Sequence, residues 1–108
     1  MFLADHDRAK ATIRYRVNHW IKGGEWMQFD GVTFSRRPPY DFQDQQTACN
    51  TAKIEADKIA HQGAYPAQRV VAVQRIEQHG DKVSFTEIMT LKIEADTQRV
   101  DLLTEVLP

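Results

Sequence analysis

Two polar residues in this sequence have the right chemistry to form an acid–base pair. His19 and Glu87 each stand in a predicted strand, at a parity otherwise occupied by apolar side chains. A buried imidazole and carboxylate exchange protons readily near neutral pH, so such pairs are common in active sites. One hypothesis is therefore a small enzyme that uses His19 and Glu87. Polar exceptions also mark strand ends, bulges and edges, and the pattern favours this structural interpretation.

The other reactive side chains point less clearly to chemistry. Cys49 lies on an apolar helical stripe, which favours a small buried hydrophobe over a nucleophile. The histidines are scattered along the chain and do not have the spacing of a zinc site. Signatures of nucleotide-binding loops and of hydrolase nucleophiles are absent from the sequence. We therefore expect no metal, no cofactor and no enzymatic activity.

A basic and aromatic pattern suggests a binding surface. Arg14, Arg16 and Trp20 share one parity, with Phe29 near them, as on sheets that stack single-stranded nucleic acid. Residues 1–40 hold seven basic against four acidic side chains (+3), and residues 41–108 hold seven against eleven (−4). The formal net charge of −1 does not attract a polyanion. Nucleic-acid binding is therefore the alternative, and an apolar contact surface is the preferred interpretation.

Length and composition predict one soluble domain over residues 1–108. With 108 residues, 42% hydrophobic and 27% charged, the chain has one core and a globular composition. A single cysteine excludes an internal disulfide, and the N-terminal residues lack the apolar run of a signal peptide. No stretch is long and apolar enough to span a membrane. These features predict a cytoplasmic protein without membrane attachment.

Period-two alternation predicts four strands in two hairpins. The first strand covers residues 11–22, and Gly23-Gly24 supplies the turn into a second strand that starts at Glu25. The third and fourth strands, over residues 68–77 and 82–94, are joined by a short polar loop. One parity of the fourth strand is expected to form a single apolar face: Val83, Phe85, Met89, Leu91 and Ile93.

A helix is predicted between the two hairpins. Asp41 is the expected N-cap and Gly63 the expected end of the helix. The tail, residues 96–108, fits a helix capped by Asp96 or Thr97 better than a strand, although its residues also alternate. The expected fold is therefore α+β: a four-stranded antiparallel sheet in hairpin–helix–hairpin order, with a short C-terminal helix or strand. The expected apolar stripe of the helix is Phe42, Cys49, Ala52, Ala56, Ile59 and Ala60.

The sheet is expected to carry apolar residues on both faces. With the Gly23-Gly24 turn, Trp26 shares a face with Ile21, while Met27 and Phe29 share the other with Trp20. One helix is too narrow to cover four strands, so the C-terminal tail, a second copy in a homodimer or a partner protein must cover the rest. The sequence thus predicts a protein-binding module. Its predicted contact residues are three apolar anchors and a basic rim: Trp20, Met27, Phe29, Arg14, Arg16, Arg36 and Arg37.

Residues 56–73, with Gly63 ending the helix and Tyr65-Pro66 turning the chain, form a helix-to-strand corner. This segment resembles the corresponding corner in some short, uncharacterised phage-encoded proteins. The resemblance implies an accessory protein of a virus or mobile element that binds and modulates a host protein. It covers about a third of the chain and assigns no functional residue.

Overall fold

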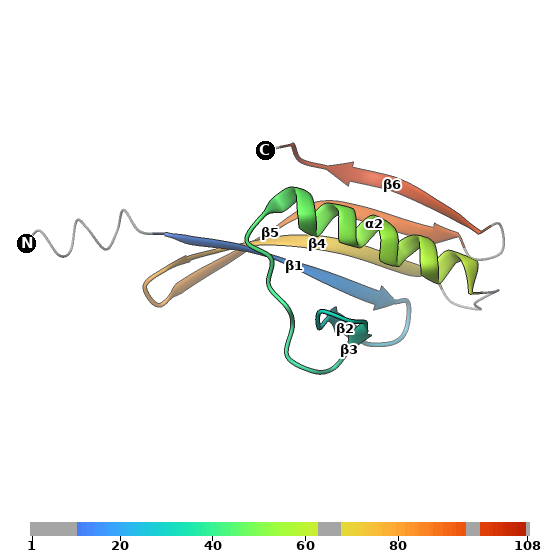
Figure 1. The fold of residues 1–108 in the computed structure, drawn as a ribbon, viewed down its shortest axis with the longest axis horizontal. Helices are drawn as coiled ribbons and strands as arrows, with labels where there is room; N and C mark the ends of the chain where they lie inside the picture. Colours follow the sequence, from blue (N-terminus) through green and yellow to red (C-terminus); the bar gives the residue numbers. More distant parts are fainter. Residues whose placement is uncertain (1–10, 63–67, 95–97, 108) are drawn as a thin grey trace, which may run out of the picture.

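The computed structural model describes residues 11–62, 68–94 and 98–107, which form one antiparallel sheet with a single helix on one face (Figure 1). The sheet has six strands in the order β3-β2-β1-β4-β5-β6. Helix α2 connects β3 to β4. As a result β1 and β4, which are far apart in the sequence, lie side by side at the centre of the sheet. The elements are β1 Thr12–Ile21, β2 Trp26–Phe29, β3 Phe34–Ser35, α2 Gln45–His61, β4 Arg69–His79, β5 Lys82–Glu94 and β6 Arg99–Glu105.

The predicted four-stranded sheet in hairpin–helix–hairpin order is wrong. Strand β3 adds a third antiparallel strand before the helix, and β6 adds a third after it. The tail is a strand and not the favoured helix, because Val100 and Leu102 pair with Ile93 and Leu91 and continue their apolar row. The expected helix caps, Asp96 and Thr97, lie outside the described residues. Pairing with β5 therefore decided between two local patterns that the sequence left open.

The hairpin between β1 and β2 has a different register from the predicted one. The Gly24 N–H donates to the Ile21 carbonyl at 2.8 Å, and Gly23 has a φ of +76°, which glycine adopts without strain. Trp20 lies opposite Trp26. A shift of one residue moves every β2 side chain to the other face. Trp26 consequently shares a face with Trp20, and Met27 lies on the opposite one.

The helix begins later than predicted. Asp44 is the N-cap, and its carboxylate accepts from the Thr47 N–H at 2.8 Å. Asp41 does not cap it, because Phe42 still pairs in an antiparallel bridge with Tyr15 and keeps the backbone extended. The helix ends at His61, and the predicted end, Gly63, lies outside the described residues.

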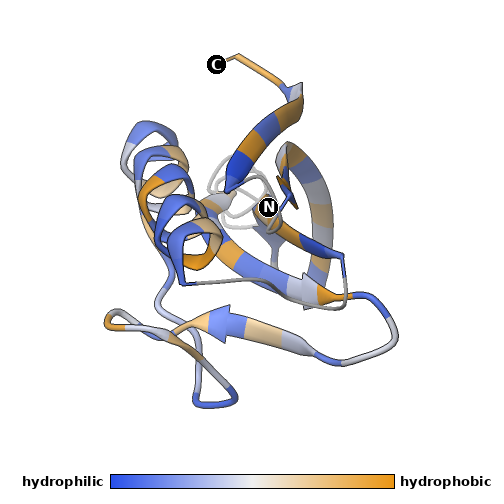
Figure 2. Cartoon of the chain, turned by 90° about the vertical axis from the view of Figure 1, so that its right-hand side faces the viewer, coloured by the Kyte–Doolittle hydropathy of each residue, from blue (hydrophilic) through white to orange (hydrophobic). Residues whose placement is uncertain are grey.

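The core lies between α2 and one face of the sheet (Figure 2). Ala48, Ala52, Ala56 and Ala60 have no exposed surface, so the helix approaches the strands closely. Their small side chains are met by larger ones from the sheet and the chain before α2, with Cys49 and Ile59 beside them. These partners are Val17, Phe29, Phe42, Val71, Val73, Ile88, Met89, Leu91 and Ile93.

A β-bulge in β5 changes which side chains face the helix. Val73 pairs with Met89 but the next residue, Gln74, pairs with Glu87, so Ile88 is the extra residue. Ile88 and Met89 are both buried under α2. On the other side of the bulge the parity is reversed. The prediction of one continuous apolar face along β5 is therefore wrong.

Candidate binding surface on the open face of the sheet

The face of the sheet turned away from α2 is called the open face. The even-numbered residues of β1 and β4 have their side chains on it. In β5 the odd-numbered residues before the bulge at Ile88 do so as well. Asn18, Ala72 and Ile76 are buried on this face, whereas Trp26 and Phe85 are more than half exposed at its two ends. Residues 98–107 extend the sheet at β6 and do not lie over β1 (Figure 1).

The two tryptophans lie at one end of the open face. Trp20 and Trp26 are direct cross-strand neighbours, with Trp20 half-buried and Trp26 54% exposed. Paired aromatic side chains across two strands stabilise a hairpin and present a broad apolar surface. Asn18, Gln28 and Gln74 join Trp26 around a shallow hollow of about 180 Å³. This end of the open face therefore combines an indole with three uncharged amides.

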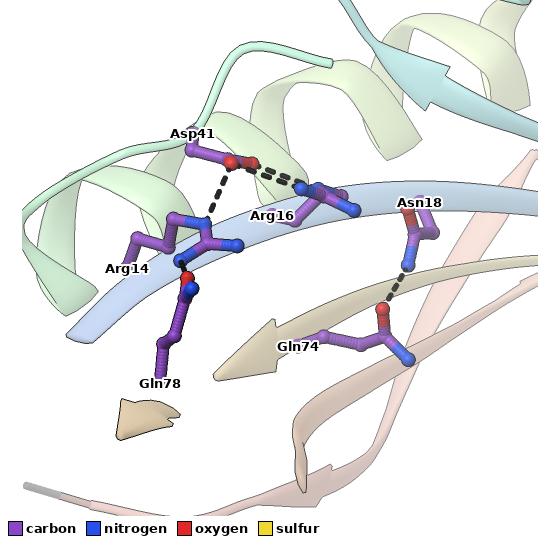
Figure 3. Close-up of polar contacts among 6 residues, drawn as sticks. All are labelled: Arg14, Arg16, Asn18, Asp41, Gln74 and Gln78. Carbon is purple, nitrogen blue, oxygen red and sulfur yellow. Dashed lines mark hydrogen bonds and ion pairs between the residues drawn. The ribbon is translucent and has the colours of Figure 1, made fainter. Parts of the chain in front are cut away.

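The amides of Asn18 and Gln74 meet across β1 and β4 on the open face (Figure 3). The Asn18 Nδ2 donates to Gln74 Oε1 at 2.8 Å. Asn18 is 4% exposed, and its Oδ1 has no hydrogen-bond partner among the described residues. Gln28 stands opposite Asn18 on β2. Gln28 and Gln74 are only partly buried, and their amides both donate and accept, so these two side chains can bind a peptide backbone in either direction.

Two of the predicted rim arginines share one carboxylate. Asp41 accepts from Arg14 Nε at 3.0 Å, from Arg16 Nε at 2.8 Å and from Arg16 Nη2 at 2.9 Å (Figure 3). Arg14 also donates to Gln78 at 3.0 Å. Burial raises the pKa of Asp41, but the hydrogen bonds and charges of Arg16 and Arg14 outweigh it and lower the pKa overall. Both arginines are therefore held in ion pairs with Asp41.

The other two predicted rim residues are paired as well. Arg36 forms an ion pair with Glu25, next to Trp26, and Arg37 Nε lies 3.1 Å from Asp30 Oδ2. Amide hydrogen bonds from Thr33 and Val32 lower the pKa of Asp30 to about 2, with a smaller effect of Arg37. All four arginines predicted as rim thus have a carboxylate partner.

The predicted anchors separate onto different faces. Trp20 lies on the open face, but Met27 and Phe29 lie on the helix side because of the hairpin register. Phe29 is only 7% exposed, stacks on Phe42 at a centroid distance of 6.1 Å and belongs to the core. Trp26 takes the place on the open face that the sequence had assigned to Met27.

The predicted acid–base pair does not form. His19 lies on the helix side, 2% exposed, with its ring 5.0 Å from that of Phe34. Burial lowers the pKa of His19 to about 4, helped by the charge of Arg69. The β5 bulge turns Glu87 to the open face, where it accepts from Thr90 Oγ1 at 2.6 Å. The sheet therefore separates the two groups.

The remaining chemistry is limited among the described residues. Cys49 is buried, and burial together with the charge of Glu105 raises its thiol pKa. Within residues 11–62, 68–94 and 98–107, His, Cys, Asp and Glu side chains do not gather in threes as a metal site requires. The helix in the described part of the chain is too short and too polar to cross a membrane.

Comparison with protein-family models, curated proteins and solved structures found no match to this chain. Support for the candidate site therefore comes from its geometry. Sequence reasoning missed two of its features, the exposed Trp26 and the role of Asp41 as the carboxylate between two arginines. The sequence did contain a sign of the role of Asp41: Tyr40 and Phe42 flank it in the alternating pattern of an extended segment. In the structure the rings of these two residues meet edge-on, with their centroids 4.9 Å apart.

Proposed function

We propose that this protein is a non-enzymatic protein-binding module that docks a partner on the Trp20–Trp26 end of its open face. The observation that carries the proposal is the half-exposed Trp26, which stands opposite Trp20 on the neighbouring strand and lines a hollow with the amides of Gln28 and Gln74. Tryptophan is the residue most enriched among binding hot spots, and it acts best where supporting side chains hold it rigid.

The partner is a protein surface without strong net charge. Arg14, Arg16, Arg36 and Arg37 are paired with Asp41, Glu25 and Asp30, which leaves a net charge of one among these groups, too little to hold a polyanion strongly. An indole beside amides instead suits an apolar side chain and the neighbouring peptide groups of a protein segment. The resemblance to phage accessory proteins adds a host protein as the partner, modulation of that protein as the effect and the cytoplasm as the location.

Affinity capture with the tagged full chain tests this proposal. Wild type, Trp26→Ala and the control Val32→Ala are compared; Val32 is 81% exposed and lies in the loop before β3. A protein retained by wild type and by the control, but lost with Trp26→Ala, supports the proposal. With that protein purified, Trp26→Ala should weaken binding by about 30-fold, as for loss of a hot spot. Equal retention by all three chains would overturn it.

A labelled single-stranded oligonucleotide distinguishes the alternative. Fluorescence anisotropy at low salt should show no binding. Salt-sensitive binding that disappears when Arg14 and Arg16 are replaced by glutamine would favour a nucleic-acid-binding protein and contradict our proposal.

A further inference from the structure

The central strands of the open face carry an uncompensated charge on each side of β4. One cross-strand row on β1, β4 and β5 consists of Arg16, Gln74 and Glu87, and all three side chains lie on this face. Arg14 and Arg16 share the single carboxylate of Asp41, so this group keeps an excess of one positive charge (Figure 3). The exposed Glu87 makes no ion pair with any described residue. The row is therefore positive at β1 and negative at β5.

No helix or strand within residues 11–62, 68–94 and 98–107 covers this row. All six strands belong to the one sheet, and α2 lies on its other face (Figure 1). The Gln74 Oε1 accepts from Asn18, but the Gln74 Nε2 has no acceptor among the described residues. In the next row, Phe85 stands opposite Ile76 and is 55% exposed. An amide donor and an aromatic ring are therefore available to a second molecule.

We propose that the open faces of two copies of this chain pack against each other around a two-fold axis that runs along β4 through Gln74. Such an axis places the β1 side of one sheet over the β5 side of the other. Arg16 of each copy then lies over Glu87 of the other, and the two Gln74 amides meet at the axis. A two-fold contact uses the same surface on both partners and stops at a dimer.

The charges are the reason for choosing a second copy, and they also select its orientation. The excess charge of the arginines is balanced by Glu87 of the other copy, so the contact as a whole is neutral. A two-fold axis across the strands would instead place Arg16 over Arg16 and Glu87 over Glu87, which is unfavourable. With the axis along β4, the next row places the Arg14 guanidinium over the exposed Phe85 ring of the other copy, a favourable cation–π arrangement.

The geometry of packed sheets leaves the tryptophan end of the open face outside this contact. Sheets that pack face to face lie about 10 Å apart, with their strands rotated by about 30°. The long side chains of Arg16 and Glu87 can meet across this distance at the centre, whereas the corners of the two sheets diverge. Trp26 stands at a corner, two strands away from β4. The dimer therefore goes beyond the proposed function and leaves its docking end free.

Sedimentation of the full chain at about 1 to 100 μM, a range that spans micromolar affinities, tests the inference. The wild type should approach twice its monomer mass of 12.5 kDa as concentration rises. Glu87→Lys sets an ammonium group against the arginines of the other copy on both sides of the axis, and should weaken dimerisation by at least about tenfold. The matched control, Glu105→Lys, makes the same charge change at an exposed position on the helix side of β6 and should dimerise like the wild type.

Gln74→Glu checks the position of the axis. It keeps the Oε1 that accepts from Asn18 but sets two carboxylates together at the axis, and it should weaken the dimer by at least about tenfold. Circular dichroism confirms that each variant is folded. A wild type that stays monomeric at about 100 μM, a species larger than a dimer, or wild-type dimerisation of either Glu87→Lys or Gln74→Glu would each overturn the inference. Trp26→Ala leaves this dimer intact, so the two proposals fail separately.

Discussion

His19 should make the protein sensitive to mild acid. His19 is 2% exposed and lies on the side of the sheet that faces α2. Neither of its ring nitrogens has a hydrogen-bond partner among the described residues. Burial and the nearby charge of Arg69 lower its pKa from 6.5 to about 4. The folded state therefore holds a neutral imidazole under conditions where an unfolded chain would already be protonated.

The sign and size follow from proton linkage. Because the pKa is lowered on folding, the unfolded chain binds the proton first as the pH falls. Above about pH 7 His19 has no effect, and stability is lost between about pH 6.5 and pH 4. The free energy of unfolding should fall by about 2 kcal/mol at about pH 5 and by about 3 kcal/mol near pH 4. Carboxylates with a lowered pKa, such as Asp30, lose their contribution only at lower pH.

Urea unfolding at a series of pH values between about 5 and 7.5 measures this effect. Wild type should lose about 2 kcal/mol across the series, which corresponds to a fall in melting temperature of roughly 10 °C for a domain of this size. His19→Phe keeps the aromatic contact with Phe34 and should remove most of the pH dependence. His61→Gln, at an exposed position on α2, should leave it unchanged. A His19 imidazole that titrates near 6.5 by NMR in the folded protein would refute the reasoning.

Three further substitutions test the fold, all by urea unfolding at neutral pH. Asp41→Asn removes the shared carboxylate of Arg14 and Arg16 and should cost about 1 to 2 kcal/mol; an unchanged midpoint would mean that these ion pairs are solvated and weak. Asp44→Ala removes the N-cap of α2 and should cost about 1 kcal/mol, with Asp44→Asn as the nearly neutral control. Ala56→Leu forces a larger side chain into a fully buried position between helix and sheet and should cost about 1 to 3 kcal/mol, whereas Ala56→Gly should show only the smaller loss expected of helix propensity.

Local patterns predicted individual segments better than their arrangement. The alternation of β1 and the long β5 could be read from the sequence, because one residue in two is apolar along much of each strand. The apolar stripe on α2 was also readable, since Cys49, Ala52, Ala56, Ile59 and Ala60 recur at helical spacing and are all buried. Strand β3, with only two residues, offers too short a period to detect.

The candidate site was only partly readable. Trp20 and the basic residues of β1 could be assigned to one face from parity alone, and the structure places them there with Asn18. Which β2 residues accompany them depended on the hairpin register. The turn residues Gly23 and Gly24 fit both registers, and packing of Phe29 into the core selects the observed one.

The sequence by itself determined where β1, β2, β4, β5 and most of α2 form, because alternation, helical spacing and glycine turns act within a few residues. The tertiary structure decided which face each side chain occupies and whether residues 99–105 join the sheet. Those outcomes depend on pairing between distant segments: the bulge at Ile88 separates Glu87 from His19, and the bridge between Tyr15 and Phe42 places Asp41 between two arginines. A single inserted residue moves the following side chains of a strand to the other face of the sheet. Whether this raises or lowers the stability depends on residues far away in the sequence, which a local pattern does not include.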